Sequence, residues 1–452
     1  MGTLLGWLFV LGIGVPVSIA LHEVGHLVPA KRFGVRCTQY MVGFGPTLWS
    51  TRRGDTEYGI KAIPLGGYVR MIGMFPPKRG AATRPDRSGR LGTLIDQARA
   101  DAQRDIGPGD GDKLFYQRSV PRRLVIMLGG PVMNLIIAAV LLGGLVTLHG
   151  LDVSATTRVL SVVECVVPVS SAADSAKAVQ RGCQASDPKS PAATAGVQPG
   201  DQIVSYDGLA VDSWPQVQDR IRANTGTPVA LGVRRAGALV TLTATPVVST
   251  RYLLDGNDQP VKAADGTYKT VQAGFLGVEP AAAFVRKPIT AVPGILGGAL
   301  VQTAGIVLQI PQKVYGVGQA VFGGGERDPN GPISLVGVGR IAGDLGSAQG
   351  SAAFPVTFGD RLVGWLSLIA SLNLALFVFN LIPLLPLDGG HVAGALWEAA
   401  RRRVAKLRHR PDPGPVDIAK ALPVAYAVVS VLVGLSVFLI YADLVKPVRI
   451  GG

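Results

Sequence analysis

Charged residues are scarce in this chain, and their scarcity excludes an ordinary soluble enzyme. Of the 452 residues, 16% are charged and 48% are hydrophobic, and the mean hydropathy is +0.34. A soluble domain carries about 25% charged residues. The chain is also too long for one domain of common size. We therefore expect a mostly α-helical, polytopic membrane protein.

The features of a cleaved signal peptide are missing as well. The first seven residues contain neither Lys nor Arg, and no small-residue cleavage site follows the apolar run that they begin. A secretory signal peptide needs both features. This run, over residues 4–28, is therefore interpreted as the first of four that reach the roughly 20 residues needed to cross a bilayer. The other three cover residues 124–148, 362–385 and 422–444.

Basic residues are distributed unevenly between these runs. Residues 31–123 contain 18 Lys or Arg and 8 Asp or Glu, residues 398–420 contain 7 and 3, and residues 151–287 contain 13 and 12. Because basic loops stay on the cytoplasmic side, the first two segments are predicted inside, and the third lies outside with both termini. The net charge of +14 then follows from topology. Without a basic groove on a soluble domain, we expect no nucleic-acid partner.

The alternation predicts about four transmembrane helices, and residues 291–322 test that number. They are apolar and Gly-rich, so they either lie on the outer face or form a fifth span, and a fifth crossing would invert the last basic loop.

The predicted parts are a first transmembrane helix (1–32), a cytoplasmic segment (33–122) with a β-loop (55–74) and a flexible insertion (78–113), a second transmembrane helix (123–149), an outer domain (150–250), a membrane-associated linker with amphipathic helices (251–360), a third transmembrane helix (361–390), a basic cytoplasmic loop (391–421) and a fourth transmembrane helix (422–446).

Only three cysteines occur in the chain. Cys37 follows the first span on the cytoplasmic side, whereas Cys165 and Cys183 both fall in the outer segment. A disulfide between the two outer cysteines is permitted. Two free buried thiols fit the pattern equally well.

The first apolar run ends in a motif for metal chemistry, His22-Glu23-Val24-Gly25-His26. Residues four apart lie on one face of a helix, so His22 and His26 can bind one Zn²⁺. Glu23 then lies beside the metal, where it can take a proton from water. A polar structural helix end is the plainer interpretation, but ionisable groups at membrane depth are costly and usually functional.

A catalytic zinc usually has three protein ligands. No acidic residue occurs between Glu23 and Asp55, and Pro29 and Arg32 stand where the metzincin extension needs Gly and His. Asp388 is the only carboxylate between Asp360 and Glu398. It follows two prolines that break the third span, and by the topology above it lies at the same depth as His26.

Other interpretations of the polar residues stay open. Asp388 can be a helix-capping carboxylate, and His391 is a rival third ligand. For Asn134 we expect a helix-bridging role. Asn373 is assigned no role.

The cytoplasmic segment contains an unusually apolar stretch, TEYGIKAIPLGGYVRMIGM over residues 56–74. Its β-branched residues and glycines predict a short re-entrant hairpin. Non-helical backbone is tolerated at membrane depth where protein or water covers it. Within the polar insertion that follows, one short helix is expected near residues 94–104.

The outer segment predicts a small α+β domain. Residues 191–208 read PAATAGVQPGDQIVSYDG, which indicates a short helix, a turn, a strand and a second turn. A helix near 213–223 and strands near 228–234 and 239–246 follow. The pattern resembles a PDZ domain, which binds an extended peptide or a chain end. Residues 166–190 are interpreted as an insertion, and a plain β-rich spacer is the alternative.

The chain resembles the site-2 protease family of intramembrane zinc metalloproteases, peptidase family M50, in its branch that cleaves anti-sigma factors. The motifs HEVGH, KAIPLGGYVRM, GPVMN and NLIPLLPLDGGH, with the PDZ domain between the last two, occur in the family's order. The resemblance implies one zinc on His22, His26 and Asp388, with Glu23 as general base and Asn380 holding the substrate backbone or oxyanion. It also implies that an unwound substrate pairs as an added strand with the loop of Ile63, Pro64, Leu65, Gly66, Gly67 and Tyr68.

The same resemblance implies partners and location. Substrates would be single-span membrane proteins, either anti-sigma factors already trimmed by another protease or signal-peptide remnants. The PDZ domain would screen them outside the bacterial plasma membrane. Two rival functions are a catalytically silent scaffold that recruits partners through this domain, and a metal transporter, which needs a polar path that the spans do not provide.

Overall fold

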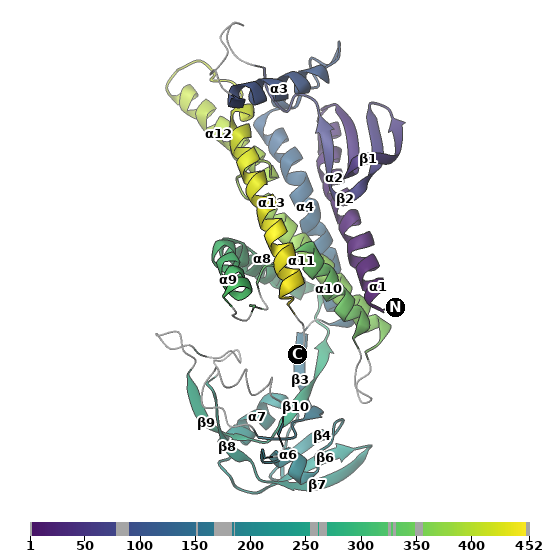
Figure 1. Cartoon of the computed structure of the whole chain (residues 1–452), viewed down its shortest axis with the longest axis vertical. Helices are drawn as coiled ribbons and strands as arrows, with labels where there is room; N and C mark the ends of the chain where they lie inside the picture. The colour runs from purple at the N-terminus through teal and green to yellow at the C-terminus, as the bar shows by residue number, and fades with distance from the viewer. Residues whose placement is uncertain are drawn as a thin grey trace. The chain divides into compact units, whose positions relative to one another are not determined.

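The computed structural model describes residues 2–77, 90–150, 152–166, 183–184, 186–253, 261, 269–323, 327–328, 331–348 and 356–448. The chain divides into two compact units. One contains the long apolar helices and the β-hairpin that follows the first of them, and the other contains residues 148–287. Each unit is described by itself (Figure 1).

Within the part of the chain that the structure describes, five helical stretches are long and apolar enough to cross a membrane. Four of them coincide with the four predicted runs, and the fifth lies in the region that the sequence leaves open. Length and composition alone do not say which of them cross. The five stretches are Gly2–Arg32, Val120–His149, Ile289–Leu308, Phe358–Asn380 and Ile418–Val445.

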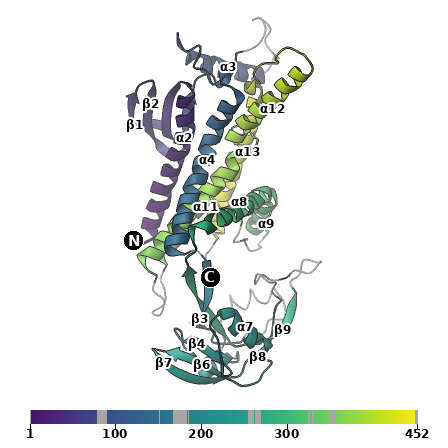
Figure 2. The same cartoon turned by 180° about the vertical axis from the view of Figure 1, so that it is seen from behind.

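The fifth stretch contains α8 (Val292–Leu308), which is followed at once by α9 (Ile310–Phe322). Figure 2 shows α8 running across α4 (Val120–Gly144) and α11 (Phe358–Asn380) rather than along them. Val292 at its start faces Gly143 near the end of α4.

The helix that carries the first motif is α2 (Val15–Arg32), which continues from α1 (Gly2–Trp7) through a π-helical stretch. It packs against α4. A β-hairpin follows, in which β1 (Cys37–Arg53) pairs antiparallel with β2 (Thr56–Met71). The predicted hairpin within 55–74 is therefore wrong in its boundaries: residues 56–71 form one bent strand, and its partner is the preceding segment.

The bend in β2 lets it pair with β1 on both sides. Tyr40 of β1 is paired with Tyr58 and also with Val69. The hydroxyl of Tyr40 donates a hydrogen bond to the carbonyl of Ala20 on α2, at 2.8 Å. Burial raises the pKa of Tyr40 to about 12, so the phenol stays a donor at all physiological pH values. The hairpin is therefore fixed to α2 within two residues of the first histidine.

The third span also ends earlier than predicted. Helix α11 stops at Asn380, and a second helix, α12 (Asp388–Leu407), begins at Asp388. The segment 391–421, expected as a loop, is therefore helical as far as Leu407. The turn between the helices contains Pro383 and Pro386, which cannot donate the backbone hydrogen bonds that a continuous helix needs.

The remaining helices of this unit are α3 (Arg90–Arg104), α10 (Leu335–Ser347) and α13 (Leu422–Val445). Helix α3 contains the short helix expected within 78–113, whereas residues 78–89 lie outside the described residues. Figure 1 shows α3 crossing the end of the bundle at which α2 finishes. Its Arg99 pairs with Asp417, which precedes α13.

The second unit has the predicted order of elements. Its main sheet runs β10-β3-β4-β6-β7, with β5 beside β4, and β8 pairs with β9 in a separate ribbon. Val217 and Leu231 are at the centre of its core. The predicted helices and strands are confirmed within two residues. The bounds are β3 Asp152–Val162, α6 Pro191–Ala195, β4 Gln202–Tyr206, β5 Leu209–Ala210, α7 Trp214–Ala223, β6 Val229–Arg235, β7 Ala238–Ala244, β8 Val247–Tyr252, β9 Thr270–Phe275 and β10 Val278–Val285.

Cys165 and Cys183 are joined by a disulfide, which resolves the alternative that the sequence leaves open. The bond closes the segment expected as an insertion. Most of that segment, residues 167–182 and 185, lies outside the described residues.

One buried ion pair makes the stability of this unit depend on pH. Asp201, which is 2% exposed, accepts two hydrogen bonds from Arg235 at 2.8 and 2.7 Å. Burial opposes its ionisation, but Arg235 and the backbone N–H of Gln198 outweigh burial and hold the pKa of Asp201 below its ordinary value. A lowered native pKa stabilises the fold above the unfolded value of about 4, and this contribution is lost as the pH falls through the native pKa.

We therefore expect Asp201→Asn to lower the local stability of residues 190–250 by about 2 kcal/mol at pH 7. Amide hydrogen exchange, corrected for its intrinsic pH dependence, measures this. Protection in the parent should fall as the pH drops below about 4, while the variant should change little. Equal pH dependence in both proteins would contradict the assignment of this pH dependence to Asp201.

Candidate metal centre

Two histidines of α2 and one aspartate of α12 converge in the helical unit. The Nε2 atoms of His22 and His26 are 3.2 Å apart. Each lies 3.4 Å from Oδ2 of Asp388. His26 is 5% exposed, and the other two are partly buried. This is the one group of three such side chains with metal-binding spacing among the described residues.

The spacing of these three atoms fits zinc. Ligands at 2.0–2.1 Å in a tetrahedron are about 3.3 Å apart along each edge. The three measured distances of 3.2, 3.4 and 3.4 Å match one face of such a tetrahedron. The donor set of two imidazoles and one carboxylate is also a common set for catalytic zinc. The residues present therefore fit a zinc ion with one position left for water or substrate.

Helix α4 determines which nitrogen of each histidine faces this point. Nδ1 of His26 lies 2.8 Å from the carbonyl oxygen of Ile126 and must donate to it, which leaves Nε2 as the metal-binding atom. Nδ1 of His22 lies 3.1 Å from the side-chain amide of Asn134, which is fully buried. A metal on Nε2 of His22 requires an N–H at Nδ1, so its partner must be the amide oxygen.

The orientation of the Asn134 amide follows from this requirement. With the amide nitrogen toward His22, the amide oxygen is buried without a hydrogen-bond partner. The two amide atoms have nearly the same size, so their assignment rests on the hydrogen-bond network. When the amide is rotated by 180°, Oδ1 accepts a hydrogen bond from Nδ1–H of His22, and the oxygen is no longer unsatisfied. Asn134 is therefore a contact of a candidate ligand, beyond the helix-bridging role that the sequence indicates.

Glycines create the space in which these groups meet. Helices α2 and α4 cross with their backbones in contact, because a Cβ atom on Gly25 would lie 2.3 Å from the carbonyl oxygen of Gly129. A Cβ atom on Gly130 would lie 2.2 Å from Nε2 of His26 and 2.7 Å from Nε2 of His22. A side chain at position 130 would thus fill the volume that a metal needs.

Glu23 lies between this cluster and the hairpin. It is 9% exposed, and Val69 of β2 offers it a backbone hydrogen bond. A Cβ atom on Gly67 would lie 3.0 Å from Cγ of Glu23, so the strand passes directly over the carboxylate side chain. Glu23 is also the one acidic residue of α2. The predicted general base and the predicted substrate-pairing loop are therefore neighbours.

The other predicted residues are distributed as follows. Asn380 is the last residue of α11, just before the turn that leads to Asp388. His391 lies one turn into α12 and is outside the cluster of candidate ligands. Asn373 is fully buried and donates hydrogen bonds to Ser18 of α2 and to the carbonyl of Ile369, so it joins two helices.

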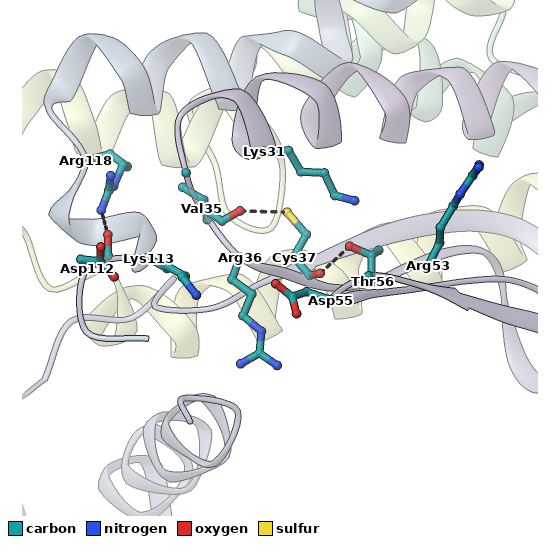
Figure 3. A pocket seen from close by; sticks show the side chains of 12 residues that line it. Lys31, Val35, Arg36, Cys37, Arg53, Asp55, Thr56, Asp112, Lys113 and Arg118 are labelled. Carbon is teal, nitrogen blue, oxygen red and sulfur yellow. Dashed lines mark hydrogen bonds between the residues drawn. The ribbon is translucent and has the colours of Figure 1, made fainter. Parts of the chain in front are cut away.

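A separate hollow of about 460 Å³ lies past the end of α2 (Figure 3). Five basic side chains and two carboxylates line it, and Cys37 lies at its floor. Burial raises the pKa of the Cys37 thiol to about 11, so it stays protonated at neutral pH and is not a reactive thiolate. The residues that line this hollow are Lys31, Gly34, Val35, Arg36, Cys37, Arg53, Gly54, Asp55, Thr56, Asp112, Lys113 and Arg118.

Comparison with known proteins gives matches to metalloproteases. The model of peptidase family M50 matches residues 8–411. The chain is 34% identical to the zinc metalloprotease Rip1 of Mycobacterium tuberculosis over 98% of this chain and 99% of that protein. It is 34% identical to Rip1 of Mycolicibacterium smegmatis, with 97% of each chain covered, and 28% identical to the metalloprotease MmpA of Caulobacter vibrioides, with 88% and 87% covered.

The close approach at Gly130 gives a direct test of the centre. We expect Gly130→Ala to lower zinc affinity by more than about tenfold, because its methyl group displaces both imidazoles. The matched control is Gly144→Ala on the same helix, where a Cβ atom meets nothing within 4 Å. Zinc content after dialysis against a graded chelator measures both. Equal zinc retention by the two variants would place the metal elsewhere.

Proposed function

The chain belongs to peptidase family M50, the site-2 protease family, and from that premise we propose that it cleaves peptide bonds inside the transmembrane segments of single-span proteins. Family membership makes it a zinc metalloendopeptidase and a multi-pass membrane protein. The observation that carries the finer proposal is the position of the cluster. His22, His26 and Glu23 lie on the helix of the first apolar stretch, which is long and apolar enough to cross a membrane. A crossing there would surround them with lipid and protein rather than water.

The roles proposed for the site residues follow from their chemistry. His22, His26 and Asp388 hold the metal, which when bound supplies a Lewis acid that lowers the pKa of water and polarises the scissile carbonyl. Glu23 removes a proton from the attacking water as the new C–O bond forms. The same carboxyl then gives that proton to the amine nitrogen as the C–N bond breaks. Its position beneath Gly67 keeps it beside the substrate backbone.

Substrate must lose its helical structure before it can be cut, because the hydrogen bonds of a helix cover the scissile carbonyl. Strand β2 offers a way to hold the unwound chain. Its residues 67–71 pair with β1 along one edge only, within the part of the chain that the structure describes. The predicted residues 63–68 continue that edge toward Glu23. Pairing there satisfies the exposed backbone groups of the substrate.

The apolar side chains of the hairpin support its position at the membrane. Phe44, Leu48, Trp49, Ile60 and Ile63 are each at least 46% exposed, which is unusual for a loop that faces water. Asn380, at the end of α11, is assigned to the substrate backbone or the oxyanion.

The outer unit is proposed as a PDZ domain, supported by its order of strands and by helix α7 beside them. In this role it admits single-span substrates whose outer portion is already short, such as anti-sigma factors after a first cut or signal-peptide remnants. The proposed location is a bacterial plasma membrane, with both termini and this unit outside. The orientation of α8 across the bundle supports four crossings.

Replacing the base separates chemistry from metal binding. We expect Glu23→Gln to keep zinc and to lose at least about 100-fold in cleavage rate of a purified single-span substrate. Glu279→Gln, the same substitution at an exposed position of the second unit, serves as the control and should keep both. Zinc is quantified on the same preparations. Undiminished cleavage by Glu23→Gln would remove Glu23 from the reaction, and zinc without cleavage by any protein would leave a scaffold as the better account.

A further inference from the structure

The open edge of β2 does not end beside Glu23. Residues 68–71 continue toward the cytoplasmic end of the bundle, where Ile72 and Phe115 are hydrogen-bonded backbone to backbone. Here the edge borders a hollow of about 340 Å³. The opposite wall is the C-terminal turn of α3 and the residue after it. The residues lining the hollow are Tyr68, Val69, Arg70, Met71, Met74, Phe75, Asp101, Ala102 and Asp105.

The charged side chains that line this hollow are mainly acidic, whereas those of residues 31–123, which contain them, are mainly basic. Residues 31–123 carry 18 basic and 8 acidic side chains, yet the hollow is lined by two carboxylates and one guanidinium. Asp105 pairs with that guanidinium, Arg70, at 2.7 Å. Asp101 is 63% exposed, and its partner is Arg104, three residues along the same helix. An exposed pair of this kind is weak, so Asp101 can accept another cation at little cost.

Two ion pairs hold the C-terminal half of α3 in this position. Arg99 is 8% exposed and pairs with Asp417, which precedes α13, while Asp105 pairs with Arg70 on β2 itself. The acidic wall is therefore fixed relative to the strand edge. A peptide that pairs with residues 67–71 must continue along this wall.

We propose that the hollow is a subsite for a basic residue in the cytosolic flank of the substrate. This inference rests on the proposed function and deepens it. Single-span membrane proteins carry Lys and Arg next to the cytoplasmic end of their span. Such a side chain reaches Asp101 and Asp105 while its apolar stem packs on Met74 and Phe75.

The geometry also sets the distance between this residue and the scissile bond. Gly67 lies beside Glu23, and Met71 lies four residues further along β2. A paired strand advances about 3.3 Å per residue, so the basic side chain is about three to five residues from the scissile bond on its cytosolic side. The subsite thus sets the distance between the scissile bond and the membrane surface, and it also increases the affinity for substrate.

The test uses the full-length protein in detergent with three single-span substrates that differ at this position, carrying Lys, Gln or Glu. The parent should cleave them in that order, with kcat/KM for Lys exceeding that for Glu by about tenfold and with the difference mainly in KM. Asp101→Lys should reverse the order and restore cleavage of the Glu substrate. Asp105 is left unchanged, because its loss would release Arg70.

The matched control is Asp55→Lys, which makes the same change of charge at an exposed position lining the hollow of Figure 3. It should keep the order of the parent. Efficient cleavage of all three substrates at equal KM would overturn the subsite and leave the protease intact. Cleavage of none of them by the parent would overturn the proposed function and the subsite with it.

Discussion

The contact between the backbones of α2 and α4 is the constraint on which the candidate centre depends. At Gly25 and Gly129 the two helices come closer than any side chain allows. This approach brings Ile126 and Asn134 of α4 within hydrogen-bonding distance of the two histidines of α2. Without it, each imidazole would lose the partner that selects its metal-binding nitrogen. Small residues are the usual means by which membrane helices come this close.

Helix α4 is connected to the third candidate ligand as well. Arg123, one turn before Ile126, forms a buried ion pair with Glu398 of α12. Glu398 also pairs with Arg402 and accepts a hydrogen bond from the backbone N–H of Val416. Asp388 is the first residue of α12, so the ion pair between Arg123 and Glu398 fixes the helix that carries Asp388. Gly389 and Gly390 let the preceding turn pack against the start of α12. One helix thus orients residues that are more than 360 positions apart in the sequence.

The sequence predicts most of the centre and less of its surroundings. His22, His26 and Asp388 are predicted as ligands from the spacing of the histidines and from the absence of other carboxylates near Asp388, and the structure brings the three side chains together. The role of Asn134 is missed because it depends on the helix crossing, although its GPVMN motif marks the position. The pairing of residues 56–71 with residues 37–53 is missed because both segments are apolar and contain glycines. This shared pattern does not indicate which segments pair. The position of α3 depends on two ion pairs between distant segments.

The central claim is that two imidazoles and one carboxylate, held by α2 and α12 against α4, form the zinc site. X-ray absorption at the zinc edge of the purified protein tests it most directly. The account predicts a shell of only nitrogen and oxygen at about 2.0–2.1 Å, with the scattering of two imidazoles. A third imidazole would assign His391 in place of Asp388. A sulfur at about 2.3 Å would contradict the site altogether.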